Sequence, residues 1–176
     1  GNPTGVVLSK EQLKDIAEIC SRHGIFFICD EVYREFVYNM PEGSLAPSLL
    51  SVPGAEEIAI VIDSTSKRYS ACGARVGCLI TRNKAVREAA LHFGQARLSP
   101  ATVDQRAAMA ALDTPASYFQ EVVAEYQSRR DLLVSGLQGI GIDLPAPRGA
   151  FYAAVPLPVT DADDFAIDLA ANREVL

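Results

Sequence analysis

Two short runs of consecutive apolar residues, each ending in an aspartate, constrain the fold of this chain more than any other feature. They are IFFICD at residues 25–30 and IAIVID at residues 58–63. A strand with one face in water alternates apolar and polar residues, whereas a strand covered on both faces is apolar throughout. The two runs therefore predict strands of a parallel sheet that is covered on both faces.

A helix is predicted before the first run. Ser9, with Gln12 three residues later, forms a capping box, and Gly24 can end the helix in a left-handed conformation. The apolar residues between these signals recur at helical spacing, so we expect them to form a buried stripe: Leu13, Ile16, Ala17 and Cys20.

The rest of the chain continues this alternation of strands and helices. ARVGCLIT at residues 74–81 predicts a third strand, and residues 83–139 predict three helices, with interruptions near Gly94 and at two prolines. The last of these helices is predicted over residues 116–137. Alternating strands and helices are typical of α/β folds.

A proline-rich stretch, PAPRG at residues 145–149, marks a domain boundary. AFYAAVPL at residues 150–157 then predicts a strand, and residues 161–176 predict a helix. We expect residues 1–139 to belong to a larger domain with a long connecting helix, and residues 140–176 to begin a smaller domain.

The composition argues against several classes of partner. The 176 residues carry a formal net charge of −6, which does not suit a nucleic-acid backbone or an anionic membrane surface. No apolar run approaches the roughly 20 residues that cross a bilayer. The four cysteines form no CxxC pair, which favours reduced thiols and a cytoplasmic location.

Lys67 is the residue most indicative of chemistry, because it lies in STSK directly after the second apolar run. A lysine forms an imine only as a neutral amine, and burial or neighbouring cations lower its pKa. Arg68 and Arg75 are close enough in sequence to supply such cations. The alternative is a solvated loop lysine, which is the commoner state of this residue type.

Asp30 ends the first apolar run, at the edge where parallel sheets hold ligands. A buried carboxylate needs a cation opposite it, and the protonated pyridine nitrogen of pyridoxal phosphate is such a cation. The alternative is that Asp30 caps the turn that follows it.

Tyr33 and Asn2 are candidates for contact with the same ligand. Tyr33 follows Asp30 by three residues and reaches the same side if the chain makes a helical turn; otherwise it is a half-buried core tyrosine. The amide of Asn2 can donate to a phenolate oxygen or a carboxylate, although Asn before Pro is also common in ordinary turns.

The residues around Lys67 match a phosphate group. The hydroxyls of Ser64 and Ser66 and the forked guanidinium of Arg75 suit phosphate oxygens. Gly73 and Gly77 would let the backbone approach closely. Serine and glycine are also ordinary loop residues, so this group carries weight only together with the lysine.

No metal site is predicted. His23 and His92 have no second ligand at a usable spacing. Cys72 lies inside the proposed site loop, where a small filler is favoured over a nucleophile.

Four motifs, taken in order, resemble those of the class I and II aminotransferases of the aspartate aminotransferase superfamily. They are NPTG at residues 2–5, DEVY at 30–33, STSK at 64–67 followed by GARVG at 73–77, and PRGAFY at 147–152. The resemblance spans nearly the whole chain. It implies an α/β fold, namely part of the mostly parallel large domain of a fold-type I enzyme plus the start of its α+β small domain, with pyridoxal 5'-phosphate as cofactor and a homodimeric assembly.

The resemblance also implies residue roles. Lys67 would hold the cofactor in a Schiff base and later act as the general base, while Asp30 would pair with the pyridine nitrogen. Asn2 and Tyr33 would contact the ring hydroxyl oxygen. Arg97 is implied as an anion contact to a neighbouring subunit's site, with an exposed loop arginine as the alternative. The phosphate would be held by Ser64, Ser66 and Arg75.

The implied reaction is transamination between an amino acid, with an aspartate-like donor favoured, and a 2-oxo acid such as 2-oxoglutarate, in amino acid biosynthesis. One alternative is another enzyme of the same fold, a carbon–sulfur lyase or a cyclopropane-forming synthase. A second is the sensing domain of a transcription regulator, which would carry a basic helix-turn-helix unit upstream. A third is a cofactor-free interaction domain, which would show no visible absorbance.

The chain is expected to be cut at both ends, because Gly1 is not a natural start and the last helical pattern has no stop signal. The family's glycine-containing phosphate turn and its ring-stacking aromatic residue would precede Asn2. The arginine that binds the substrate α-carboxylate would follow Leu176. We therefore expect this chain to be inactive alone.

Overall fold

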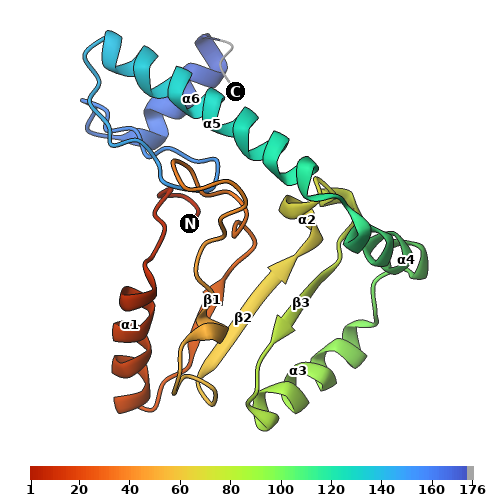
Figure 1. Ribbon diagram of the computed structural model, residues 1–176. Helices are drawn as coiled ribbons and strands as arrows, with labels where there is room; N and C mark the ends of the chain where they lie inside the picture. Colours follow the sequence, from red (N-terminus) through yellow and green to blue (C-terminus); the bar gives the residue numbers. More distant parts are fainter. Residues whose placement is uncertain (174–176) are drawn as a thin grey trace.

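The computed structural model describes residues 1–173, in which α-helices flank a three-stranded sheet (Figure 1). The strands are β1 (Phe27–Asp30), β2 (Ala59–Ser64) and β3 (Gly77–Ile80), hydrogen-bonded in that order. β1 and β2 are parallel, with Asp30 opposite Ile62, and β3 is antiparallel to β2. The predicted α/β class is confirmed, and the sheet is mixed.

Helix α1 (Lys10–Arg22) begins at the predicted capping box. The hydroxyl of Ser9 accepts from the Gln12 amide at 3.2 Å, and the Gln12 side chain accepts from the Ser9 amide at 2.8 Å. Gly24 follows the helix with φ of +62°, as predicted. Ile16 is only half-buried, whereas the rest of the predicted stripe is buried: Leu13, Ala17 and Cys20.

The core lies between α1, the sheet and a short 3₁₀ helix, η1 (Leu49–Ser51). Leu49 is completely buried there. Glu31, directly after β1, is buried too, and its carboxylate accepts from the Ser48 hydroxyl at 3.0 Å and the Leu49 amide at 2.8 Å. Glu31 therefore ties the start of η1 to the end of β1.

One face of the sheet is open at β1 and β3 in residues 1–173, so the prediction of a strand covered on both faces is wrong for β1. It holds for the start of β2, where Ala59, Ile60 and Val61 are all buried. Half-buried and exposed residues alternate along β1, and Ile28 is 65% exposed. All of β3 is exposed. The cause is that α1 and η1 pack on one face only.

β3 is shorter than the predicted strand over residues 74–81. Residues Cys72–Ala74 form a 3₁₀ helix, η2, and Arg75 takes a left-handed conformation with φ of +55°. That conformation turns the chain and is incompatible with extended pairing, so the strand begins only at Gly77.

Three α-helices follow β3, as predicted. They are α3 (Lys84–Arg97), α4 (Thr102–Ala110) and α5 (Ala116–Gly139), with a 3₁₀ helix, η3 (Ala111–Asp113), before the last. The predicted interruption near Gly94 is wrong, because one glycine costs a helix only about 1 kcal/mol relative to alanine. In Figure 1, α5 runs across the upper end of the sheet.

Within the described residues no helix has the length and apolar character needed to cross a membrane.

The predicted strand over residues 150–157 is absent. Only Gly149 forms a β-bridge, with Val37, and the Ala150 amide donates to the Phe36 carbonyl at 2.9 Å. Beyond that point no strand lies alongside the segment, so no ladder continues. The predicted C-terminal helix is present as α6 (Ala162–Asn172), and residues 174–176 of that prediction lie outside the described part of the chain.

Candidate functional site

The proposed site residues gather where β1 and β2 end. Asp30 is the last residue of β1 and Ser64 the last of β2, and the two strands are parallel neighbours. A one-turn helix, α2 (Thr65–Arg68), follows β2 directly and carries Lys67. The parallel pairing therefore places Asp30 and the turn that carries Lys67 at the same end of the two strands, and Figure 1 shows α2 at that end of the sheet.

Lys67 is half-buried and points toward an aromatic residue. Its Nζ atom lies 5.9 Å from the centre of the Phe151 ring, at the limit of a cation–π contact, and 3.7 Å from the Cys72 sulfur. Arg75 does not serve as a neighbouring cation in the way expected, because it is exposed and donates to the Cys72 carbonyl at 3.0 Å.

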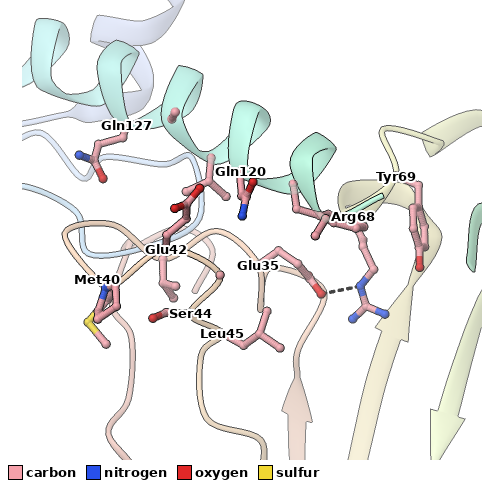
Figure 2. Close-up of a pocket in the computed structure, with 16 residues that line it drawn as sticks. Glu35, Met40, Glu42, Ser44, Leu45, Arg68, Tyr69, Gln120 and Gln127 are labelled. Atoms are coloured by element: carbon pink, nitrogen blue, oxygen red, sulfur yellow. Dashed lines mark ion pairs between the residues drawn. The ribbon is translucent and has the colours of Figure 1, made fainter. Parts of the chain in front are cut away.

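Arg68 is not a free cation either, because two carboxylates surround it. Its Nη2 atom lies 2.7 Å from Asp63 Oδ2. Its Nε atom lies 2.6 Å from Glu35 Oε1, the ion pair drawn in Figure 2. The Nε–H makes no hydrogen bond with the described residues, so the Glu35 contact is an ion pair, while the Asp63 contact is a directed hydrogen bond. Burial raises the pKa of Glu35, and the charge of Arg68 opposes that rise.

Asp30 is exposed rather than buried, contrary to the expectation of a buried carboxylate with a cation opposite it. Its Oδ1 atom accepts from the Val32 amide at 3.1 Å, so the capping alternative is present in the structure. The turn that Asp30 caps is closed by the Arg34 amide, which donates to the Glu31 carbonyl at 3.1 Å. The cap occupies only Oδ1, so it does not exclude a ligand at the other carboxylate oxygen.

Tyr33 makes the contact that sequence reasoning missed. Its hydroxyl lies 2.7 Å from the hydroxyl of Tyr152, and its ring meets the Phe151 ring edge-on at 5.1 Å. Burial, reinforced by the hydrogen bond to Tyr152, raises the pKa of Tyr33, which keeps the hydroxyl protonated at neutral pH. Phe151 and Tyr152 belong to PRGAFY, the motif that also supplied the mistaken strand prediction.

Two cavities flank this region. One of about 210 Å³ includes Asn2, Asp30 and Tyr33 among its lining residues. A larger one, of about 630 Å³, lies between the loop after Glu35, the end of α2 and α5 (Figure 2). It is lined by Arg68 but by none of the proposed cofactor contacts, so its volume alone does not make it the site.

The proposed phosphate contacts are partly assembled. The Ser64 hydroxyl lies 2.8 Å from the Ser66 hydroxyl and accepts from the Ser66 amide at 3.0 Å. It also donates to the Val76 carbonyl at 3.1 Å. The exposed guanidinium of Arg75 donates to the Cys72 carbonyl at 3.0 Å, so only the two hydroxyls are held together by a hydrogen bond. Hydroxyls and a forked cation are donors that suit a phosphate.

Gly73 and Gly77 were both expected to let the backbone approach a ligand closely, and the structure gives them different surroundings. A Cβ atom on Gly77 would lie 2.9 Å from the Asp63 carbonyl oxygen, so Gly77 is needed for close pairing of β3 with β2, rather than for a ligand as expected. A Cβ on Gly73 would meet nothing within 4 Å. Only Gly73 leaves open space beside the loop.

The remaining candidates lie outside this cluster. Arg97 is the exposed last residue of α3, and nothing in the structure tests its predicted contact with a neighbouring subunit. All four cysteines are free thiols, as predicted. Among residues 1–173 no group of three or more acidic, histidine or cysteine side chains is placed to hold a metal ion.

Comparisons of the sequence and the structure with known proteins all identify aminotransferases as similar. The family model for aminotransferase class I and II matches residues 1–176. LL-diaminopimelate aminotransferase 2 of Trichormus variabilis is 34% identical over 157 residues, which is 89% of this chain and 40% of that protein. This chain thus spans about 40% of the length of that relative.

Solved structures of similar proteins share the fold. Aspartate aminotransferase from Thermotoga maritima superimposes with a TM-score of 0.83 and 29% identity, over 98% of this chain and 44% of that one. N-succinyldiaminopimelate aminotransferase from Mycobacterium tuberculosis gives a TM-score of 0.86 and 27% identity, over 98% and 45% of the two chains.

Proposed function

We propose that this chain, which belongs to the class I and II aminotransferase family, supplies the lysine-bearing part of a pyridoxal 5'-phosphate site for transamination. The observation that carries the proposal is the parallel pairing of β1 with β2. It brings Asp30, at the end of one strand, to the same sheet edge as the helical turn that holds Lys67. An acid, an amine and phosphate donors at one edge are the groups that this cofactor needs.

Each proposed contact has a donor or acceptor of the right kind. The carboxylate of Asp30 would face the ring nitrogen and keep it protonated. Tyr33, held as a phenol, would donate to the ring hydroxyl oxygen together with the amide of Asn2. The bound cofactor supplies an electron sink for charge that develops at the substrate α-carbon. The phosphate would be held by Ser64, Ser66 and Arg75.

Lys67 would have two tasks. Its amine would hold the cofactor covalently, and as a free amine it would act as the base that moves the proton at the substrate α-carbon. Lys67 is half-buried, and the centre of the Phe151 ring lies 5.9 Å from its amine. Chemistry at Lys67 is therefore proposed to occur in a partly enclosed position.

The favoured substrates are an aspartate-like donor and a 2-oxo acid such as 2-oxoglutarate. The similar proteins above are named for aspartate, LL-diaminopimelate and N-succinyldiaminopimelate. Each of these donors is an amino acid with more than one carboxylate, which supports a polycarboxylic donor for this protein. A diaminopimelate-type donor is thus the second candidate, and a homodimer in the cytoplasm remains the proposed assembly and location.

The test uses the complete protein with added pyridoxal phosphate. We expect a visible absorption band that L-aspartate or LL-diaminopimelate removes and that 2-oxoglutarate restores, with little response to L-alanine. Lys67→Ala should abolish this cycle, whereas Lys84→Ala, in the first turn of α3, should leave it intact. With a cysteine-type thioether as substrate, release of a thiol, ammonia and a 2-oxo acid without any acceptor would instead indicate a lyase, and binding without turnover would indicate a sensing domain.

A further inference from the structure

We infer that Arg68, held between Glu35 and Asp63, is a positioning residue that sets the direction of the Lys67 amine. The inference rests on the proposed function, because it concerns the lysine that would attach the cofactor. Neither Glu35, Asp63 nor Arg68 belongs to the proposed set of cofactor contacts.

The helix that carries Lys67 is too short to hold its own position. α2 has four residues, whereas isolated helices shorter than about 12 residues are marginal in water. Its orientation must therefore come from contacts at its two ends. A change in that orientation would move the Lys67 amine directly.

The first end of α2 is fixed by hydrogen bonds to the loop before β3. Ser64 caps the turn, accepting from the Ser66 amide at 3.0 Å. The Thr65 amide and hydroxyl both donate to the Val76 carbonyl, at 3.1 Å and 3.0 Å. These bonds hold the start of the turn and do not involve its last residue.

The second end is fixed through Arg68. The Asp63 carboxylate that binds Arg68 also accepts from the Ser64 amide at 2.7 Å. Asp63, in β2, therefore contacts both the residue before α2 and its last residue. Glu35 approaches from the segment after β1 and meets Arg68 on its other side. The side chains of consecutive helical residues point in directions about 100° apart. When Asp63 and Glu35 hold the Arg68 side chain, the Lys67 side chain therefore points away from them, toward Phe151.

The ion-paired side chains of Glu35, Asp63 and Arg68, here called the ion triad, also connect three segments that carry proposed cofactor contacts. Glu35 follows Tyr33 by two residues, Asp63 precedes Ser64, and Arg68 follows Lys67. The side chains of Arg68, Asp63 and Glu35 are only 22%, 17% and 13% exposed. Solvent screens such contacts less than surface ion pairs, so they can hold the segments in register.

Stability alone does not account for this arrangement. A buried ion pair often adds little net stability over apolar residues, because both charges lose their hydration. Burial raises the pKa of Glu35, which shows that ionising this carboxylate has a cost in the folded state. These three charged side chains are therefore better explained by a role in positioning Lys67 than by a contribution to stability.

The experiment compares covalent attachment with stability in the complete protein. Glu35→Gln keeps the shape and removes the buried charge, so we expect an unchanged or slightly raised melting temperature. We expect the rate at which borohydride fixes pyridoxal phosphate to the protein to fall about fivefold, the effect of losing one partly buried ion pair. Arg68→Met should slow that rate by at least about tenfold, because it leaves two carboxylates unpaired.

Matched controls separate the possible outcomes. Arg129→Met removes another ion-paired arginine, on α5 and bonded to Glu125, and should trap cofactor at the wild-type rate. Wild-type trapping by Glu35→Gln and Arg68→Met would overturn the positioning role. Covalent trapping by Lys67→Ala would instead overturn the proposed function, so the two failures are distinguishable.

Discussion

At the scale of single residues, the contact between the hydroxyls of Tyr33 and Tyr152 has the clearest consequence. The two residues are 119 positions apart, and Phe151 packs edge-on against Tyr33 to hold it in place. A hydrogen bond to an anionic oxygen is stronger than one to a neutral oxygen. In the proposed site Tyr33 therefore donates to the ligand, and Tyr152 donates to Tyr33.

Tyr152→Phe removes the second donor without changing the ring. Because hydrogen bonds in a chain polarise one another, Tyr33 becomes a weaker donor and the ligand oxygen is less stabilised as an anion. We expect the pKa of the cofactor–Lys67 linkage to rise by roughly 0.5, measured by pH titration of the visible band.

Tyr126→Phe is the matched control. Tyr126 stacks on Phe151 in the same aromatic cluster, with ring centres 5.0 Å apart, but its hydroxyl bonds to none of the described residues. Its variant should titrate like the wild type. A shift of equal size in both variants would show that ring packing, and not the hydroxyl pair, sets the pKa.

At the scale of elements, local signals predicted helices well because they act within a few residues. The capping box at Ser9 and the stop at Gly24 both appear in α1. The contacts of Phe151 and the Glu35–Arg68 pair were not predictable, since both join segments far apart in sequence. The false strand over residues 150–157 has the same cause: its pattern suits a strand, but pairing needs a neighbour.

Ser9→Ala tests the start of α1. The variant loses the side-chain acceptor for the Gln12 amide, so the free energy of unfolding of the complete protein should fall by about 1 kcal/mol, measured by urea denaturation. Ser21→Ala, near the end of the same helix, should leave stability unchanged or slightly higher, because alanine is the better helix former. Equal losses in both variants would contradict the capping role.

At the scale of the whole molecule, the open face of the sheet is the main difference from expectation. Apolar side chains gather there and on the helices beyond β3, and Ile28 is 65% exposed although it lies in a continuously apolar strand. Exposed apolar groups of this extent mark surfaces that other structure covers. The predicted domain boundary near residue 140 stays a prediction, because nothing in the structure of residues 1–173 tests it.

Ile28→Asp tests whether this face is covered in the complete protein. A charge placed on a covered face should lower the free energy of unfolding by more than about 2 kcal/mol. Lys14→Asp, on the outer side of α1, should lower it by no more than about 1 kcal/mol, because it replaces the exposed Lys14–Glu18 ion pair with a solvent-screened repulsion. If Ile28→Asp is equally well tolerated, the face is exposed to water in the complete protein as well.

The most direct test of the central claim is to reduce the complete protein with borohydride in the presence of pyridoxal phosphate and to map the modified peptide by mass spectrometry. The proposed site predicts that one peptide, the one containing Lys67, carries the pyridoxyl group at close to one per chain. A pyridoxyl group on another lysine, with Lys67 unmodified, would contradict the proposed site.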